Sequence, residues 1–232
     1  MSRGTFFALV LSAGYCTSTL FAGDLTGKVM FEGDSPKMPR IRMSADPVCT
    51  KAHKEPVVSD EVVVNGNHTL KNVIISITEG LKPRKYDAPK ESVEFDQMGC
   101  QYTPHVIALQ TGQDLVVVNS DPTLHNVHSL SKENPQFNVA QPKKGMRLTK
   151  KFAKPELFKV KCEVHTWMGA YIGVFDNPFF AVTGDDGSFK IDRLPAGEYT
   201  VQAWHEKYGV QTMKVTVGAK ESKAVDFKFA AK

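Results

Sequence analysis

The sequence is poor in several features that mark large classes of proteins. It has four cysteines in 232 residues, and its formal net charge is only +4. This charge is too small to indicate a nucleic acid as partner. No apolar run reaches the roughly 18–20 residues that a membrane-spanning helix needs. We also find no G-x-S-x-G motif, no phosphate-binding loop and no haem-attachment motif.

Segments with the period of a long helix are also missing, whereas short strand patterns are frequent. Four runs are rich in β-branched residues and bounded by turn-forming residues: 27–31, 72–77, 105–109 and 114–119. Residues 183–204 have the alternation of a hairpin, with Phe189 and Ile191 on one face and turns at 184–187 and 195–197. These patterns predict an all-β protein of sandwich type.

The first 22 residues have the pattern of a secretory signal peptide. Arg3 precedes an apolar stretch, and small residues follow at Ala22 and Gly23. We expect cleavage near Ala22, removal of Cys16 with the leader, and a periplasmic or secreted mature protein. The alternative is that this stretch forms a buried helix or strand.

A short loop at 161–168 contains three metal-ligating residue types at intervals of three: Cys162, His165 and Met168. The alternation of the preceding strand pattern directs Cys162 inward. Further upstream, His125 follows an apolar strand and an Asp-Pro turn. Two histidines and a cysteine with a weak methionine ligand form the donor set of a blue-copper electron-transfer site. The set leaves no obvious open position for a substrate.

The stretches "LHNVHS" and "KVKCEVHTWMGAYIGV" resemble the cupredoxin family, and its amicyanin and plastocyanin members most. The resemblance covers residues 92–178 and implies a Greek-key sandwich that holds one type I copper ion through His125, Cys162, His165 and Met168. It further implies that Asn126 braces the ligand loop and that His165 is the exposed ligand. The sequence departs from amicyanin at Leu124, where amicyanin has proline.

The two flanking parts of the chain resemble a second family. The segments "GKVMFEG" and "TGDDGSFKIDRLPAGEYTVQAWHEKYG" are similar to the carboxypeptidase regulatory-like, transthyretin-like module. The resemblance implies an immunoglobulin-like or transthyretin-like β-sandwich formed by residues 23–91 with 179–232. The copper domain, residues 92–178, would then be inserted into it. Such modules serve mostly as scaffolds.

Two features suggest how an electron could leave the site and where a redox partner could dock. Trp167 and Tyr171 lie near His165 in sequence and could form an apolar exit patch. Segment 143–161 has eight Lys or Arg residues against one Glu, which fits either a docking surface for an acidic redox protein or a solvated strand face. The lysines assigned to this surface are Lys143, Lys144, Lys150 and Lys151.

The remaining cysteines and histidines are less informative. If Cys16 is removed and Cys162 binds copper, Cys49 and Cys100 are left as a pair. Export favours a disulfide between them, and the alternative is two separate buried thiols. His53 follows Cys49 at a weak metal spacing and fits a loop beside a disulfide better. A second metal site could use His105, His128 and His205, but ordinary packing or surface placement is the favoured interpretation of these three.

We therefore interpret the protein as an exported single-electron carrier rather than an enzyme. Two alternatives stay open. One is a module that stores or delivers copper, or a non-redox binding module. The other is a copper enzyme with a second site that the sequence does not show.

Overall fold

A computed structural model describes residues 22–231 of the chain. The expected leader therefore lies outside the described residues, except for Ala22, which is the first residue of strand β1. Within the described range, no helix is both long and apolar enough to cross a bilayer.

The described chain is almost entirely β, as the sequence predicts. It contains one short helix, α1 (Pro47–Lys51). The strands are β1 (Ala22–Glu32), β2 (Ile74–Glu79), β3 (Val93–Met98), β4 (Gln101–Thr103), β5 (Val106–Gln110), β6 (Leu115–Asn119), β7 (His125–Ser129), β8 (Asn138–Gln141), β9 (Arg147–Lys150), β10 (Glu156–Lys161), β11 (Gly169–Phe175), β12 (Phe180–Val182), β13 (Ser188–Pro195), β14 (Gly197–His205), β15 (Gly209–Val217), β16 (Ser222–Ala224) and β17 (Phe227–Ala230).

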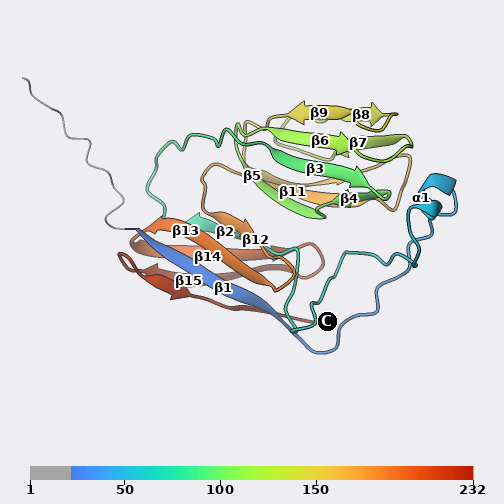
Figure 1. Ribbon diagram of the computed structural model, residues 1–232. Helices are drawn as coiled ribbons and strands as arrows, with labels where there is room; N and C mark the ends of the chain where they lie inside the picture. The colour runs from blue at the N-terminus through green and yellow to red at the C-terminus, as the bar shows by residue number, and fades with distance from the viewer. Residues whose placement is uncertain (1–21, 232) are drawn as a thin grey trace, which may run out of the picture.

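These strands form four sheets that make two sandwiches (Figure 1). The first sandwich, here called the flanking sandwich, has the sheets β13-β1-β16, with β17 also paired to β1, and β12-β2-β14-β15. The second, here called the ligand sandwich, has the sheets β5-β11-β10-β7-β8 and β4-β3-β6-β9. Strands from both ends of the chain build the flanking sandwich, while β3 to β11 build the ligand sandwich between them.

Each sandwich has its own hydrophobic core. Leu25 and Val29 of β1 pack in the flanking core with Phe189 and Ile191, and all four are at most 5% exposed. The alternation predicted for the hairpin is thus observed, because the apolar residues of β13 face one side.

The core of the ligand sandwich continues into the predicted ligand loop. Phe158 and Val160 of β10 point inward, and Cys162 follows them on the same side at 1% exposure. This is the orientation that the period-two alternation predicts. The strand pattern therefore delivers the thiol to the interior of the ligand sandwich.

The two sandwiches meet through aromatic and charged side chains. The rings of Tyr171 (β11) and Trp204 (β14) lie 5.0 Å apart. His105, between β4 and β5, contacts the carboxylates of Asp60, at 3.2 Å, and Glu206. Burial opposes the charged imidazole, but these carboxylates outweigh it and raise the pKa of His105 to about 9.

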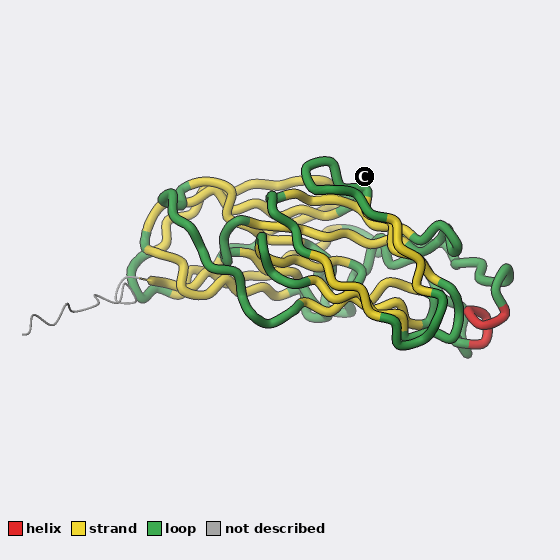
Figure 2. The backbone as a smooth tube through the Cα atoms, turned by 90° about the horizontal axis from the view of Figure 1, so that it is seen from above, coloured by secondary structure: helices red, strands yellow, loops and turns green. Residues whose placement is uncertain are grey.

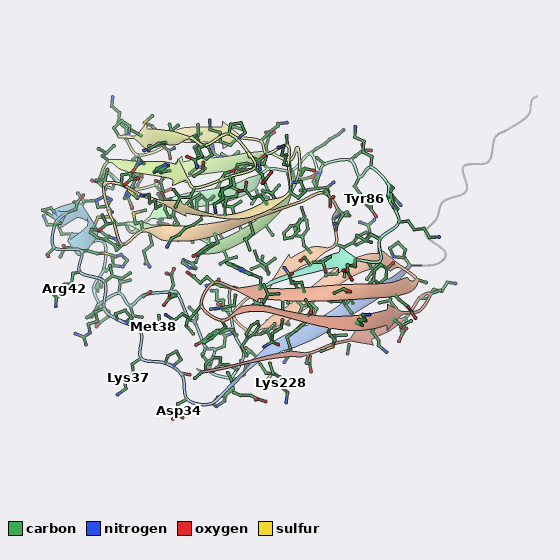
Figure 3. The ribbon with its side chains drawn as sticks, turned by 180° about the vertical axis from the view of Figure 1, so that it is seen from behind. Asp34, Lys37, Met38, Arg42, Tyr86 and Lys228 are labelled. Carbon is green, nitrogen blue, oxygen red and sulfur yellow. A yellow bond between two sulfur atoms is a disulfide. The ribbon has the colours of Figure 1, made fainter. Side chains whose placement is uncertain are left out.

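One segment crosses from the flanking sandwich to the ligand sandwich and back. Figure 3 shows the chain running past Asp34, Lys37 and Met38 to Arg42, away from β1. Residues 41–57 follow and include α1, which lies at one end of the molecule (Figure 2). We call this segment the cover.

The cover belongs to the ligand core, although the sequence assigned it to the flanking sandwich with the rest of 23–91. Met43 and Cys49 are buried in the ligand core, and Ile41 and Val57 pack against it. The difference arises because the cover lacks a strand of the flanking sheets and buries its apolar side chains against the other sandwich.

Candidate metal centre

Two chain segments bring the predicted ligands together inside the ligand sandwich. His125 is the first residue of β7, Cys162 follows β10, and His165 and Met168 lie in the loop before β11. Two backbone hydrogen bonds tighten this loop: the Met168 amide donates to the His165 carbonyl, and the Cys162 amide donates to the Met168 carbonyl. All four side chains are at most 2% exposed.

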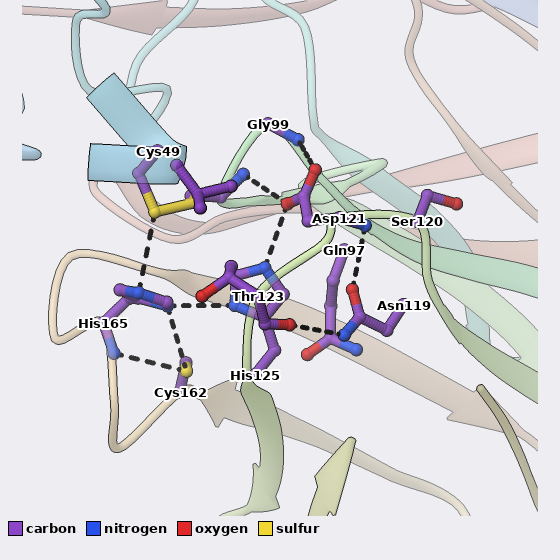
Figure 4. Close-up of polar contacts among 12 residues, drawn as sticks. Cys49, Gln97, Gly99, Asn119, Ser120, Asp121, Thr123, His125, Cys162 and His165 are labelled. Carbon is purple, nitrogen blue, oxygen red and sulfur yellow. Dashed lines mark hydrogen bonds and ion pairs between the residues drawn. A yellow bond between two sulfur atoms is a disulfide. The ribbon is translucent and has the colours of Figure 1, made fainter. Parts of the chain in front are cut away.

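The donor atoms of three of these residues converge. The Nδ1 atoms of His125 and His165 lie 2.9 Å apart, and the Sγ of Cys162 lies 3.9 Å from Nδ1 of His165 (Figure 4). One donor atom from each residue falls within 4.8 Å of the others. Met168 is buried in the same core cluster as Cys162. A thiolate with two imidazoles is a donor set that suits copper, so the residues present fit the metal that the sequence implies.

The surroundings of the three donors affect their protonation. Burial opposes ionisation of the Cys162 thiol, but the hydrogen bond with His125 and nearby backbone amides outweigh it and lower its pKa. Burial also opposes the charged form of His125, yet Asp121 and Cys162 raise its pKa to about 9. The pKa of His165 is lowered, first by burial and then by the charge of His125, against the opposing effect of Asp46.

Asn126 links the two segments that bear the predicted ligands through hydrogen bonds. Its Oδ1 accepts a hydrogen bond from the amide of Glu163 at 2.6 Å, directly after Cys162 in the chain. Its own carbonyl accepts a hydrogen bond from the Tyr102 hydroxyl at 2.7 Å. Asn126 thereby ties the start of the Cys162 loop to the strand that bears His125.

Two carboxylates that the sequence analysis did not select contact the outer edges of the ligand histidines. Nε2 of His125 lies 2.9 Å from Asp121, and Nε2 of His165 lies 3.1 Å from Asp46. A sequence signal for them exists: the chain has two Asp-Pro dipeptides, and they begin at these two aspartates. Each precedes a cysteine or histidine of the site by three or four residues.

Asp121 is held by a tight turn between β3 and β4. Gly99 and Cys100 both have positive φ, 63° and 55°, the conformation of a two-residue hairpin turn. Their amides donate to the Asp121 carboxylate at 2.8 and 2.7 Å. Burial raises the pKa of Asp121. The hydrogen bonds with His125 and with these two amides lower it by more, so the pKa lies below its usual value.

The structure joins Cys49 of the cover to Cys100 of this turn by a disulfide, with Cα atoms 5.4 Å apart. Both residues are fully buried in the ligand core. The bond therefore fastens the cover to the ligand sandwich rather than joining the two sandwiches.

The expected exposure of His165 is wrong, because the cover lies over this ligand. His165 is 2% exposed. Its Nε2 edge, which would face solvent in an open site, meets Asp46 at 3.1 Å and the Cys49 sulfur at 3.5 Å. Both of these residues belong to the cover.

The two aromatic residues proposed as an exit patch lie in different surroundings. The Trp167 ring lies 5.0 Å from the His165 ring, and its Nε1–H donates to the Cys100 carbonyl at 3.0 Å. Tyr171 instead packs against Trp204 of the flanking sandwich. Tyr171 therefore contributes to the seam between the sandwiches, whereas Trp167 stays beside the ligand.

The basic segment is exposed but largely paired. Lys151 contacts Asp114 at 3.4 Å, and the Lys150 ammonium lies 4.7 Å from the centre of the Phe137 ring. Lys143 and Lys144 lie in the exposed loop between β8 and β9. Within the described part of the chain, Lys143 and Lys144 are therefore free in an exposed loop, whereas Lys150 and Lys151 contact neighbouring side chains.

Four further histidines, His53, His105, His128 and His205, are engaged outside the ligand cluster. His53 Nε2 contacts the Gly99 carbonyl at 2.6 Å, and His128 pairs with Glu163 at 2.5 Å. His105 lies at the seam, and His205 is buried at 1% exposure. Among residues 22–231, none of them belongs to a cluster of three metal-capable side chains.

Comparisons with known proteins match only part of the chain. The model of the carboxypeptidase regulatory-like domain matches residues 169–230, from β11 to β17. None of the curated proteins matches the sequence.

Similar solved structures include copper proteins. A copper-containing nitrite reductase from Thermus scotoductus SA-01 has 20% identity and a TM-score of 0.34, over 43% of this chain and 26% of its own. A reduced amicyanin mutant has 19% identity and a TM-score of 0.33, over 36% of this chain and 81% of its own. A purple cupredoxin from Nitrosopumilus maritimus has 24% identity and a TM-score of 0.28, over 32% of this chain and 80% of its own.

Proposed function

We propose that this protein is an exported type I copper protein that passes single electrons between redox partners. The observation that carries the proposal is the buried convergence of His125, Cys162 and His165, whose donor atoms lie within 4.8 Å of one another. Copper bound there, with Met168 as a weak additional ligand, would supply a one-electron couple.

The residues around this cluster suit electron transfer because they hold the donors fixed. Asn126 ties the Cys162 loop to β7 through the hydrogen bond from the Glu163 amide. Asp121 and Asp46 fix the outer edges of the two imidazoles. Donors that cannot move keep the same positions in both oxidation states, which lowers the rearrangement that each transfer requires.

Trp167 is the proposed exit for the electron. The cover removes the His165 edge from solvent, whereas Trp167 is half-buried and its ring lies against His165. A partner that docks beside Trp167 would approach the ligand through one aromatic ring. The partner itself is proposed to be a redox protein, with Lys143 and Lys144 available to an acidic surface.

The test is a titration of the metal-free protein with Cu(II), followed by visible spectroscopy and voltammetry. We expect a strong blue absorption and reversible one-electron cycling. In Cys162→Ser, a hard hydroxyl replaces the soft thiolate, so the colour should vanish while the circular dichroism of the β fold is kept. A Cys162→Ser protein that keeps the wild-type visible spectrum would show that Cys162 is not a ligand.

The same material separates copper storage or delivery from electron transfer. The four ligands are at most 2% exposed and the cover lies over His165, so we expect a chelator to remove copper slowly. Fast removal together with irreversible cycling would favour storage or delivery instead.

A further inference from the structure

We propose that Asp46, carried by the cover, is a positioning residue for the ligand His165: it fixes the tautomer of the imidazole and places a negative charge behind it that favours Cu(II) over Cu(I). This inference rests on the proposed function, because it assigns His165 to copper. It concerns a contact made by a segment outside the strands of the ligand sandwich.

The first observation is the direction of the two ring nitrogens of His165. Nδ1 points at His125 Nδ1 and the Cys162 sulfur (Figure 4). Nε2 lies 3.1 Å from the Asp46 carboxylate. A carboxylate only accepts hydrogen bonds, so Nε2 must carry the proton. The lone pair of Nδ1 is then directed at the donor cluster. Carboxylate partners of this kind orient ligand histidines and raise their basicity.

The second observation is that the Asp46 carboxylate is held in place by two other hydrogen bonds and by a disulfide nearby in the chain. Its Oδ1 accepts from the Val48 amide at 2.7 Å and so caps α1, and its Oδ2 accepts from the Thr123 hydroxyl at 2.7 Å. Three residues along the chain, Cys49 fastens the same segment to Cys100. The carboxylate is thus fixed to both the cover and the segment that leads to His125.

The third observation is the charge around His165. A histidine binds a metal as the neutral imidazole, and the His165 ring is 2% exposed with its Nε2 3.1 Å from the Asp46 carboxylate. A negative charge against a neutral ligand ring stabilises the higher positive charge of Cu(II) more than that of Cu(I), because the site is shielded from water. Removal of this charge should therefore raise the reduction potential.

Three variants separate the functions of Asp46. Asp46→Asn keeps the cap and an acceptor oxygen but removes the charge. Asp46→Ser keeps a good helix cap, but its side chain is shorter and cannot span the contact with His165. The matched control is Glu163→Gln, which removes a charge next to Cys162 in sequence, where the side chain pairs with His128 and Lys161 rather than with a ligand.

Two measurements are made on each variant. The first is the reduction potential of the copper-loaded protein. For both Asp46 variants we expect the ratio of Cu(II) to Cu(I) affinity to fall by about tenfold or more, which is about 59 mV for one electron. For Glu163→Gln we expect a clearly smaller change. Equal shifts in Asp46→Asn and Glu163→Gln, or no shift in either Asp46 variant, would overturn the role of the charge.

The second measurement needs no metal. In nitrogen-15 NMR of the metal-free protein, His165 should show the Nε2–H tautomer in the wild type and in Asp46→Asn, and a mixture in Asp46→Ser. A wild-type His165 with the proton on Nδ1 would overturn the inference. A wild type that shows the Nε2–H tautomer but gives no blue copper species would instead reject the proposed function and leave the Asp46 contact established.

Discussion

The two sandwiches share their strand patterns but bury different kinds of side chain. Among residues 22–231, the buried hydrophobic cluster of the flanking sandwich consists of aliphatic and aromatic residues, without cysteine or methionine. The core of the ligand sandwich contains three cysteines and two methionines. It is also crossed by buried amides, carboxylates and imidazoles, among them Gln97, Asn119 and Gln141 at 1% exposure or less.

The buried polar groups of the ligand sandwich form one connected support for the first ligand segment. Gln97 donates to Gln141 at 2.6 Å, and Asn119 donates to the Gln141 carbonyl at 2.7 Å. Asn119 Oδ1 in turn accepts from the amide of Asp121 at 2.9 Å. Buried polar groups cost free energy unless they are paired. In this network they are paired with one another, and the pairing holds the turn that leads to His125. Under the proposed function, the flanking sandwich is the scaffold and the ligand sandwich holds the copper.

The same core substitution in each sandwich should test whether they are independent. Leu115 and Leu194 are both fully buried, one in each core. Replacing either by alanine should lower the free energy of unfolding of its own sandwich by about 2–5 kcal/mol. The chain has two tryptophans, Trp167 and Trp204, so replacing one with phenylalanine leaves a reporter for a single sandwich during denaturant titration.

If the cores are independent, Leu115→Ala shifts the transition reported by Trp167 and leaves that reported by Trp204 in place, and Leu194→Ala does the reverse. If both transitions shift together in both variants, the sandwiches unfold as one cooperative unit and the comparison fails.

Removing the disulfide should destabilise the ligand sandwich alone. Cys49 and Cys100 are 51 residues apart in sequence, and a closed loop of that length contributes about 4 kcal/mol in the chain-entropy model. In the double variant Cys49→Ser/Cys100→Ser, we expect the free energy of unfolding reported by Trp167 to fall by about this amount. We also expect a chelator to remove copper faster. An unchanged chelation rate would show that the cover closes the site without its disulfide.

The contact of His105 with Asp60 and Glu206 should make the seam between the sandwiches dependent on pH. The pKa of His105 is raised to about 9 in the folded protein, against about 6.5 in an unfolded chain. The contribution of His105 to the free energy of unfolding is therefore fully present below about pH 6.5, and it is lost as the pH rises through 9. The shift corresponds to at most about 3 kcal/mol.

Urea titrations of the wild type between pH 6 and 10 should show this loss, and His105→Gln should remove it. His128→Gln is the control, because His128 pairs with Glu163 on the surface of the ligand sandwich, away from the seam. A wild type and a His105→Gln protein with parallel pH profiles would contradict the assignment.

The smallest expected effect concerns the basic segment. Lys143→Gln/Lys144→Gln should slow electron exchange with hexacyanoferrate, an anionic reagent, by roughly two- to fivefold at low salt, and the difference should disappear at high salt. Lys150→Gln/Lys151→Gln should have less effect, since Lys151 pairs with Asp114 and Lys150 lies on Phe137. Identical rates in both double variants and the wild type would reduce the segment to a solvated face.

The sequence by itself determined the features that repeat at short range. Alternating apolar residues predicted the strands of both sandwiches and the inward direction of Cys162, because the side chains of a strand alternate with period two. The spacing of Cys162, His165 and Met168 also predicted three candidate metal ligands on one loop, since residues so close in sequence remain close in any fold.

Tertiary structure alone decided what surrounds the ligands. Asp46 and Cys49 are 119 and 116 residues from His165 in the chain, yet they meet its outer edge. No periodicity carries that information, because the cover forms no strand whose register could be predicted. It lies over the site because its apolar side chains and its disulfide partner are in the ligand core, and this burial is what turned an expected exposed ligand into a closed one.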